Sequence, residues 1–598
     1  MDPVYNNFSI TIATVNGSGS QTSNLTLMRA LFKMGIPVSG KNLFPSNIQG
    51  LPTWYTIRMN EDGNLARCEA QEITVAMNPA TFVKDMEGLV QGGVLFYDDS
   101  IKIPITRSDV HLYPMPVKEM VRDSGAPSNI RDYIANMVYV GIVANILGID
   151  MENIYHALDF HFKGKQKPIE LNWGMVKNAF DWAAKNLHKT DVYSVRPSNK
   201  TDGYIMADGN TAAALGALFG GLQFAAWYPI TPATSLAETL NEFVPIFRKD
   251  PVTGKNTCVV LQAEDELAAI GMVVGAGWSG LRAMTSTSGP GFSLMVEYVG
   301  LAYFSEVPLV IWDIQRIGPS TGLPTRTSQG DMRLAYFMGH GDVKNVILLP
   351  GSVNECFEFG WKAFDIAERL QTPVIVLSDL DFGMNQWMTK PFEYPDKPMD
   401  RGKILWEEDL QKMENKWGRY TDVDGDGIPY RTLPGNRLPN AAYFARGTGH
   451  DEYANYSEQP KDWENNLLRI GRKIDGSITM LPKPVINSSN EVKVGLISYG
   501  STDVAIQEAL TILSKKGYKL NHLRIRALPP SHEVREFIRS NERNYVIELN
   551  RDGQLHQILS LEVPDSAMNL ISLSHLDGLP LTAEWVVNQV ENQEELIK

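Results

Sequence analysis

The sequence predicts an α/β fold in several domains, and three observations carry this prediction. Strand-length apolar runs alternate with helix-length amphipathic stretches, which is typical of parallel sheets covered by helices. The 598 residues are enough for roughly three or four domains that each bury a core. Residues 383–490 break this rhythm and are rich in Pro, Gly, Trp, Tyr and charge, as functional or interface segments often are. We therefore expect α/β domains at 1–195, 203–382 and 491–598, with 383–490 as a connecting and interface segment.

The N-terminal domain begins with an apolar strand at 8–15, followed by a helix whose apolar residues recur every three or four positions. A further strand is expected at 92–97 and a further helix at 136–147. The turn that joins the first strand to its helix contains Gly17 and Ser18. It is either a plain tight turn or a cradle in which backbone N–H groups and the serine hydroxyl face an anion such as a coenzyme phosphate.

The second domain follows a polar, turn-forming stretch at 197–202. It contains strands at 258–261, 283–286, 309–312 and 373–377, separated by helical patterns. This alternation predicts a doubly wound sheet. The last domain opens with an apolar strand and an amphipathic helix, which again indicate an α/β unit.

Composition and charge exclude several classes of protein. The net charge is −14, and no block of Lys and Arg is interleaved with aromatic residues, so we expect no nucleic-acid binding. No apolar run reaches about eighteen residues, so no membrane span is expected. The N-terminus lacks the basic and apolar regions of a signal peptide, which makes the cytoplasm the expected location.

Metal ligands are sparse in the sequence. The three cysteines are far apart and form no CxxC pair, so we expect any iron–sulfur centre on another chain. Asp422, Asp424 and Asp426 are spaced like the start of an EF-hand loop, but its twelfth position is Leu433 instead of Glu. These three carboxylates are weak candidates for a Ca²⁺ or Mg²⁺ site, and an Asp-Gly turn that caps its own backbone is the alternative. We assign no metal ligand to this chain.

The most informative segment is Tyr228-Pro229-Ile230-Thr231-Pro232. Two prolines fix their own φ angles and push their neighbours toward extended geometry, so the segment is a rigid turn. Thr231 lies between the prolines, and its hydroxyl is therefore held in one direction.

Three carboxylates, Glu264, Asp265 and Glu266, follow the strand at 258–261 and begin the helical pattern at 267–277. A carboxylate at such a junction can hydrogen-bond a nitrogen of a ligand. The alternative is that these acids only favour the N-terminus of the helix through its dipole.

A glycine-rich loop, Ser288-Gly289-Pro290-Gly291, comes after the strand at 283–286. Its glycines permit close approach of the backbone, and Pro290 offers a flat apolar edge. Such a loop is suited to packing against a planar ring, although Gly-Pro-Gly is also a common turn.

Arg316 follows the strand at 309–312, and ligands of open parallel sheets bind beyond the carboxyl ends of the strands. A guanidinium matches a carboxylate in a bidentate way, so Arg316 is a candidate for binding an acidic substrate. The alternative is an ordinary ion-pair partner.

In this order, the four motifs resemble the pyrimidine-binding domain of the thiamine-dependent 2-oxoacid:ferredoxin oxidoreductases. Residues 1–195 resemble the family's gamma domain and residues 491–598 its transketolase-C-terminal-like domain. The chain is thus identified as a member of this family, a gamma–alpha fusion subunit of the 2-oxoglutarate:ferredoxin oxidoreductase type. The resemblance implies oxidative decarboxylation of a 2-oxoacid, with coenzyme A as acyl acceptor and ferredoxin as electron acceptor. It also implies that the reaction reverses when the ferredoxin is reducing enough.

The resemblance gives roles to individual residues. In the thiamine families the working glutamate begins a helix with Gly nine positions later, so Glu266 with Gly275 fits, and Glu264 is the alternative. This carboxylate binds the aminopyrimidine ring and assists its proton transfer. Arg316 would hold the 1-carboxylate of the substrate. The pyrimidine ring would pack on Ser288, Gly289 and Pro290. The coenzyme A and substrate path would pass Tyr228, Pro229, Thr231 and Pro232.

The resemblance also implies that two subunits share the active site. In the family a separate beta chain supplies the diphosphate- and Mg²⁺-binding domain and a [4Fe-4S] cluster, so thiamine diphosphate is shared between the chains. The absence of a GDG…N motif and of CxxC from this sequence agrees with that division. We expect a dimer of alpha–beta heterodimers and an inactive lone chain. Two alternatives are a non-catalytic scaffold subunit and a thiamine decarboxylase or synthase subunit without redox function.

Overall fold

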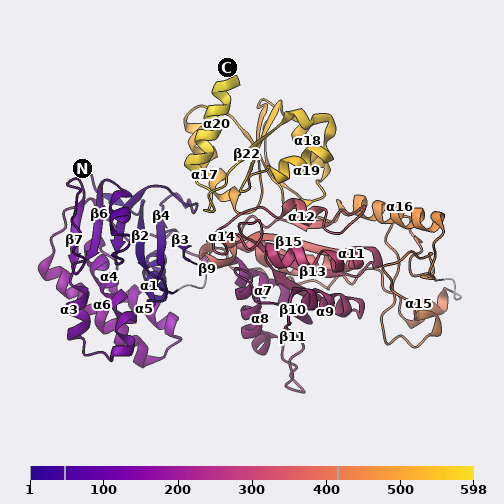
Figure 1. Ribbon diagram of the computed structural model, residues 1–598, viewed down its shortest axis with the longest axis horizontal. Helices are drawn as coiled ribbons and strands as arrows, with labels where there is room; N and C mark the ends of the chain where they lie inside the picture. The colour runs from indigo at the N-terminus through magenta and orange to yellow at the C-terminus, as the bar shows by residue number, and fades with distance from the viewer. Residues whose placement is uncertain (1, 46–48, 414–416, 598) are drawn as a thin grey trace. The chain divides into compact units, whose positions relative to one another are not determined.

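The computed structural model describes residues 2–45, 49–413 and 417–597, and Figure 1 shows its elements in chain order. The chain forms two compact units. The first consists of Met1–Ala207, Asn385–Pro391 and Thr582–Val586, and the second of Asp208–Met384, Phe392–Leu581 and Val587–Lys598. The boundary expected at 197–202 lies close to the end of the first unit. The central, connecting and C-terminal segments, which we expected as separate parts, belong to one compact unit.

The first unit contains a six-stranded mixed sheet in the order β3-β4-β2-β5-β6-β7. These strands are β2 (Phe8–Val15), β3 (Val38–Leu43), β4 (Pro52–Met59), β5 (Gln71–Ala76), β6 (Leu89–Asp98) and β7 (His111–Met115). β2 is parallel to β5, with Ile10 opposite Ile73, and antiparallel to β4, with Ile10 opposite Ile57. The strands predicted at 8–15 and 92–97 are confirmed as β2 and part of β6. Two short pairs complete the unit: β1 (Val4–Tyr5) with β8 (Tyr193–Ser194), and β9 (Ile205–Ala207) with β16 (Trp387–Thr389).

Helices complete the core of the first unit. They are α1 (Ser20–Lys33), α2 (Phe82–Glu87), α3 (Val117–Asp123), α4 (Arg131–Leu147), α5 (Met151–Phe162) and α6 (Gln166–Asn186). α4 includes the helix predicted at 136–147 and is buried around almost its whole circumference. At Gly141 it approaches α6 so closely that a Cβ would collide with the Val176 carbonyl oxygen. Only glycine permits this packing of α4 against α6.

The second unit contains a seven-stranded sheet in the order β11-β10-β12-β13-β15-β14-β20. These strands are β10 (Phe224–Trp227), β11 (Val259–Gln262), β12 (Ala283–Thr287), β13 (Leu309–Gln315), β14 (Val346–Leu348), β15 (Pro373–Asp379) and β20 (Ala527–Leu528). All are parallel except β20. Its helices are α7 (Gly209–Phe219), α8 (Thr234–Phe247), α9 (Glu266–Trp278), α10 (Gly289–Leu294), α11 (Val296–Ser305), α12 (Met332–Tyr336), α13 (Val353–Leu370) and α14 (Leu380–Met384). The four predicted strands are confirmed as β11, β12, β13 and β15.

The C-terminal segment adds a five-stranded sheet in the order β17-β19-β18-β21-β22. These strands are β17 (Val485–Asn487), β18 (Val494–Ser498), β19 (Asn521–Arg524), β21 (Arg543–Glu548) and β22 (Leu570–Ser574), with helices α17 (Thr502–Lys515), α18 (His532–Ser540), α19 (Gln554–Glu562) and α20 (Ala583–Ile597). This segment is tied to the central sheet. β20 pairs with β14, with Leu528 opposite Ile347, and the buried Gln329 amide bonds Tyr499 and Leu549 backbone atoms, both at 3.0 Å.

The segment 383–490 is less irregular than we predicted. It contains α15 (Glu407–Lys412) and the eighteen-residue helix α16 (Pro460–Ser477). The prediction missed α16 because its buried face is polar: Arg469 and Lys473 both bind the fully buried carboxylate of Glu306. Charged residues on the inner face hide the apolar period that identifies a helix.

The carboxylates Asp422, Asp424 and Asp426 are neutralised by side-chain cations. Lys403 Nζ lies 2.7 Å from the Asp424 carboxylate and 2.8 Å from that of Asp426, and Arg472 binds Asp422 at 2.9 Å. Asp422 also accepts the Gly427 N–H at 3.1 Å. Because an ammonium group lies where an EF-hand loop would hold a cation, the geometry favours the Asp-Gly turn over a metal site.

No helix in the described part of the chain is long and apolar enough to cross a lipid bilayer.

Candidate active site

Four adjacent parallel strands of the second unit end at one edge of its sheet. They are β11, β10, β12 and β13, and chain order reverses at β10, which lies between β11 and β12. Residues that follow such a reversal face a crevice in doubly wound sheets. The four motifs singled out in the sequence follow these four strands, so the topology brings them together.

The turn after β10 is held in place by two neighbouring side chains. Asn210 of α7 donates to the carbonyl oxygen of Pro232 at 2.9 Å, and Thr234 accepts the N–H of Ile230 at 3.0 Å. Tyr228 and Pro229 are exposed at the surface of the unit. The turn therefore presents the predicted residues from a fixed backbone.

The three carboxylates after β11 have three different environments. Glu264 is exposed to solvent. Asp265 caps α9 by accepting the Ala268 N–H at 2.6 Å. Glu266 is 8% exposed and its side chain accepts no hydrogen bond among the described residues. The helix-capping alternative thus accounts for Asp265, and Glu266 is the carboxylate left buried and available.

The glycine-rich loop after β12 packs directly on Glu266. A Cβ at Gly291 would lie only 2.6 Å from both Cγ and Oε1 of Glu266, so glycine is required for this approach. The Ser288 hydroxyl is fully buried and donates to the Ile314 carbonyl at 2.8 Å, which fixes the loop on β13. The Ser288 hydroxyl therefore has no proton left to donate to a ligand, and Ser288 contributes to the site only by its shape.

Arg316, which follows β13, is 6% exposed and reaches the turn after β10. Its Nη1 donates to the Thr231 carbonyl oxygen at 2.7 Å. Its Nε is buried without a hydrogen-bond partner, and no carboxylate lies within ion-pair distance among the described residues. Burial lowers the pKa of the guanidinium, while Asp331 and Asp313 oppose that shift. Arg316 is therefore no ordinary ion-pair partner, and it retains capacity to bind an anion.

Two carboxyl groups influence Arg316 from inside the unit. Asp313 on β13 is fully buried, and no N–H or hydroxyl group among the described residues donates to either of its oxygens. Burial raises the pKa of Asp313, and the nearby Asp331 carboxyl raises it further. Burial also raises the pKa of Asp331 to about 6. The pair therefore retains a proton far more readily than two solvated carboxylates would.

A cavity of about 470 Å³ lies between Arg316 and Asp331 on one side and the C-terminal segment on the other. The central sheet contributes Pro290, Arg316 and Asp331 to its wall. The C-terminal segment contributes Asn550 and Gln554, which lie at the N-terminal end of α19. The cavity is large enough for a small carboxylic acid, and its walls combine two guanidinium groups, carboxyl groups and amides.

The turn with Gly17 and Ser18 lies in the first unit, between β2 and α1. The N-cap of α1 is Gly19, with φ of 81° and no side-chain cap. The Ser18 Oγ is buried without a hydrogen-bond partner, while the Ser18 carbonyl accepts from Asn136 at 2.8 Å. The first N–H groups of α1 are uncapped, as an anion cradle requires, while the Ser18 N–H closes a tight turn on the Val15 carbonyl oxygen at 3.1 Å.

Sequence reasoning missed the two buried carboxyls and the C-terminal wall of the cavity. Asp313 interrupts the apolar strand Leu309–Gln315, and a charged residue in such a strand is a detectable signal. Asp331 and Gln554 lie far apart in sequence and carried no comparable pattern.

Comparisons with known proteins agree with the motifs. Residues 215–414 match the family described as "Pyruvate flavodoxin/ferredoxin oxidoreductase, thiamine diP-bdg", and residues 9–182 match "Pyruvate ferredoxin/flavodoxin oxidoreductase". The 2-oxoacid:ferredoxin oxidoreductase subunit alpha of Saccharolobus solfataricus is 36% identical, over 92% of this chain and 92% of that protein. The subunit alpha of the Aeropyrum pernix oxidoreductase 2 is 30% identical, over 98% of this chain and 97% of its own length.

Two further similarities concern 2-oxoglutarate. The 2-oxoglutarate synthase subunit KorA of Methanothermobacter marburgensis is 35% identical, over 58% of this chain and 89% of that protein. The solved 2-oxoglutarate:ferredoxin oxidoreductase of Magnetococcus marinus, with 2-oxoglutarate, coenzyme A and succinyl-CoA bound, is 28% identical. It aligns with a TM-score of 0.86 over 98% of this chain and 100% of the solved chain.

Proposed function

The chain belongs to the 2-oxoacid:ferredoxin oxidoreductase family as an alpha-type subunit, and we propose that it oxidatively decarboxylates a 2-oxoacid together with a beta chain. The products are an acyl-CoA and CO₂, with ferredoxin as the electron acceptor. 2-Oxoglutarate is the first candidate substrate because it is bound in the Magnetococcus marinus structure and named for the KorA subunits. The observation that carries the proposal is Arg316, a buried guanidinium with an unpaired Nε at the wall of the cavity.

Glu266 and the glycine-rich loop fit the aminopyrimidine half of thiamine diphosphate. Glu266 is buried and lacks a hydrogen-bond partner among the described residues, and Gly291 leaves its carboxylate room to face a ring. The cofactor supplies the means to hold negative charge at the reacting carbon. A carboxylate on the pyrimidine ring assists proton transfer there, which is the role that we propose for Glu266. Ser288, Gly289 and Pro290 would support the ring.

The solvent exposure of Glu264 weakens it as the alternative carboxylate. A solvated carboxylate loses strength as a hydrogen-bond partner because water competes for it. Glu264 lies on the exposed side of the strand-to-helix junction, and we propose that it contributes to an interface or to cofactor binding rather than to proton transfer.

Arg316 would hold the 1-carboxylate of the 2-oxoacid. Its Nη1 is fixed on Thr231, so its remaining donors have a defined direction. The proton retained by Asp313 and Asp331 limits their negative charge, so that the guanidinium remains attractive to an incoming carboxylate. Tyr228, Pro229, Thr231 and Pro232 would line the path of the substrate and of coenzyme A.

The turn at Gly17 and Ser18 would bind a phosphate group of coenzyme A. Its support is the uncapped N-terminus of α1 and the buried, unpaired Ser18 hydroxyl. Both present donors to an anion, and the helix dipole adds to the attraction.

We propose that the beta chain completes the site with the diphosphate and Mg²⁺ site and a [4Fe-4S] cluster. Next to Glu266, β11 is an edge strand whose Val259 and Leu261 are 54% and 40% exposed. Leu267 on α9 adds to this apolar surface, which suits contact with another chain. A dimer of alpha–beta heterodimers in the cytoplasm is the assembly that we propose.

The two alternative functions explain fewer features of the chain. A non-catalytic scaffold does not require a buried unpaired Arg316 or a glycine packed on Glu266. A thiamine decarboxylase or synthase without redox function does not require the domain at 9–182, which matches the oxidoreductase family.

The proposal is tested by CoA-dependent reduction of a dye by the chain co-expressed with its beta partner, over a panel of 2-oxoacids. We expect the highest kcat/KM with 2-oxoglutarate and no reduction without CoA. Turnover that is independent of CoA would contradict the oxidoreductase assignment, and a preference for pyruvate would contradict only the substrate.

A further inference from the structure

The carboxyl groups of Asp313 and Asp331 hydrogen-bond each other inside the second unit. A carboxylate oxygen can only accept a hydrogen bond, so this contact requires a proton on one of the two groups. Among the described residues, no N–H or hydroxyl group donates to either oxygen of Asp313 or to Oδ2 of Asp331. The pair is therefore held together by one shared proton and not by neighbouring donors.

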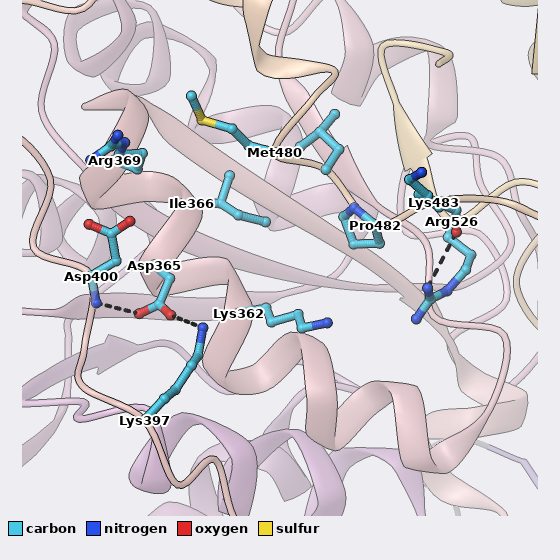
Figure 2. Close-up of a pocket in the computed structure, with 11 residues that line it drawn as sticks. Lys362, Asp365, Ile366, Arg369, Lys397, Asp400, Met480, Pro482, Lys483 and Arg526 are labelled. Atoms are coloured by element: carbon cyan, nitrogen blue, oxygen red, sulfur yellow. Dashed lines mark hydrogen bonds and ion pairs between the residues drawn. The ribbon is translucent and has the colours of Figure 1, made fainter. Parts of the chain in front are cut away.

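A carboxylate elsewhere in the second unit shows how such a group is otherwise satisfied. In the cavity of about 690 Å³ beside α13, Asp365 accepts the Asp400 N–H at 3.2 Å and binds Lys397 Nζ at 3.0 Å (Figure 2). Asp313 is fully buried, yet it forms no such contact within the part of the chain that the structure describes. Burial of a carboxyl group without donors costs free energy unless the group keeps a proton, so this exception is a candidate for function.

Asp331 lies in the wall of the cavity that also contains Arg316. A Cβ at Gly289 would lie 3.0 Å from Asp331 Oδ2, so the carboxyl group packs against the glycine-rich loop. The N–H of Asp331 donates to Oε1 of the buried Gln315 at 3.1 Å, which fixes its backbone. Asp331 is therefore held between the loop proposed for the cofactor and the cation proposed for the substrate.

A proton donor at this place fits the first bond change of the proposed reaction, and its role rests on that proposed function. A 2-oxoacid has its oxo group next to its carboxylate, so a carboxylate bound by Arg316 brings the oxo oxygen to the wall that contains Asp331. When a carbon nucleophile adds to the oxo carbon, the π electron pair of the C=O bond moves to the oxygen, which then needs a proton. We propose that Asp331 is the general acid that gives the shared proton to this oxygen.

The proton transfer balances in both directions. As the nucleophile adds, the O–H bond of the acid breaks, its electron pair stays on the carboxylate, and a new O–H bond forms on the substrate. When two electrons later pass to ferredoxin and the C=O bond forms again, this O–H bond breaks and the proton returns to Asp331. Asp313 is fully buried on β13 and acts as a positioning residue, because its hydrogen bond keeps the proton on the pair.

The charged groups around the pair favour retention of its proton. Burial raises the pKa of Asp313 and the Asp331 carboxyl raises it further, whereas Arg316 lowers it. Arg551 and Asp552, in the same cavity wall, are exposed and pair with each other at 2.6 Å. The pair therefore keeps its proton at a pH at which a solvated carboxyl group has lost it, as a general acid must.

The first test follows the proton by infrared difference spectroscopy of the co-purified alpha–beta complex loaded with thiamine diphosphate. Adding 2-oxoglutarate without coenzyme A should remove the carbonyl band of a protonated carboxylic acid, and this band should shift in D₂O. Asp331→Asn and Asp313→Asn keep the volume of the buried side chains and should abolish the loss of this band. The matched control is Asp85→Asn, at a buried carboxyl of the first unit that accepts from Trp54 and Thr81, and it should leave the loss unchanged.

The second test separates acid catalysis from substrate binding in the same variants. Asp331→Asn should lower kcat by about 100-fold or more, as the loss of a general acid implies. Its Kd for the 2-oxoacid, titrated in a complex without thiamine diphosphate, should stay within about twofold of wild type, because Arg316 is intact. In Asp313→Asn, the pH at which kcat declines should move downward, because the amide donates to the Asp331 carboxylate and favours its ionised form. Asp85→Asn should keep the wild-type kcat and pH profile.

Each outcome decides the proposal. A wild-type complex that turns over no 2-oxoacid removes the proposed function, and the role of Asp331 with it. In an active complex, the role of Asp331 alone is overturned if Asp331→Asn keeps kcat within about twofold of wild type or still loses the carboxylic acid band. A loss of kcat matched by an equal loss of 2-oxoacid affinity would assign Asp331 to the support of Arg316 instead. If Asp331→Asn does not assemble, an unchanged pH profile of Asp313→Asn contradicts the shared proton.

Discussion

The contact between Gly291 and Glu266 allows a sharp test of the site. In Gly291→Ala, the new Cβ would collide with Thr287 Oγ1 and lie 2.6 Å from Cγ and Oε1 of Glu266, whereas ordinary contacts between such atoms are about 3.5 Å. The backbone of the loop is fixed by Ser288 on β13, so the Glu266 side chain has to move, by about 1 Å.

This displacement should affect activity much more than stability. Overpacking costs about 1–3 kcal/mol, and the higher helix propensity of Ala returns about 1 kcal/mol of that loss in α10. A misplacement of about 1 Å at a reacting group can lower turnover by about 100-fold. We therefore expect Gly291→Ala to lower kcat of the alpha–beta complex by about 100-fold, with a free energy of unfolding that falls by no more than about 2 kcal/mol.

The assay is CoA-dependent dye reduction by the complex, alongside thermal unfolding of the chain. Gly471→Ala is the matched control, because Gly471 lies within α16 and a Cβ there meets nothing within 4 Å. The control should keep wild-type activity and gain a little stability. If Gly291→Ala retains activity within about twofold of wild type, Glu266 is not the carboxylate that this loop positions for the reaction.

Four further results are expected. Glu266→Gln should lower turnover by roughly two to four orders of magnitude with the fold intact, whereas Glu264→Gln should stay active. If steady-state kinetics show the reverse pattern, Glu264 is the carboxylate that assists proton transfer. Arg316→Lys keeps the charge but loses the planar fork, so the KM for the 2-oxoacid should rise while that for coenzyme A stays constant. Burial raises the pKa of Asp331 to about 6 in the fold, above that of a solvated carboxyl, so the free energy of unfolding should fall as pH rises from about 4 to 6. In Asp331→Asn this fall should become smaller in thermal unfolding curves and should not vanish, because burial also raises the pKa of Asp313. The purified lone chain should be colourless, contain no stoichiometric iron and bind thiamine diphosphate weakly, and a brown chain on its own would contradict the shared site.

The fold was predictable where one physical signal dominated. Parallel strands such as β13 and β15 are mostly apolar runs, and Arg316 was predicted to lie beyond the carboxyl end of its strand, where ligands of parallel sheets bind. α16 was not predictable because Arg469 and Lys473 occupy its buried face, and their partner Glu306 is more than 160 residues away. Asp313 was detectable as a charged residue within the apolar strand β13, but nothing in the sequence shows that the Asp331 carboxyl lies close to it. The two partners of a buried charged pair are brought together only by the fold.

The solvent exposure of the edge strand β11 also supports our proposal that two chains share the active site. Its sequence, Val-Val-Leu-Gln after Cys258, has the apolar character of a buried parallel strand, and Cys258 is indeed 3% exposed. Yet Val259 is 54% and Leu261 40% exposed, at the open edge of the sheet. An exposed apolar edge strand is a liability for an isolated protein, because it presents unpaired N–H and C=O groups and apolar side chains together. Such a strand shortly before Glu266 is understandable if another chain covers it, as the beta chain would in the assembly that we propose. The apolar character of β11 therefore indicates a surface that becomes buried only on assembly.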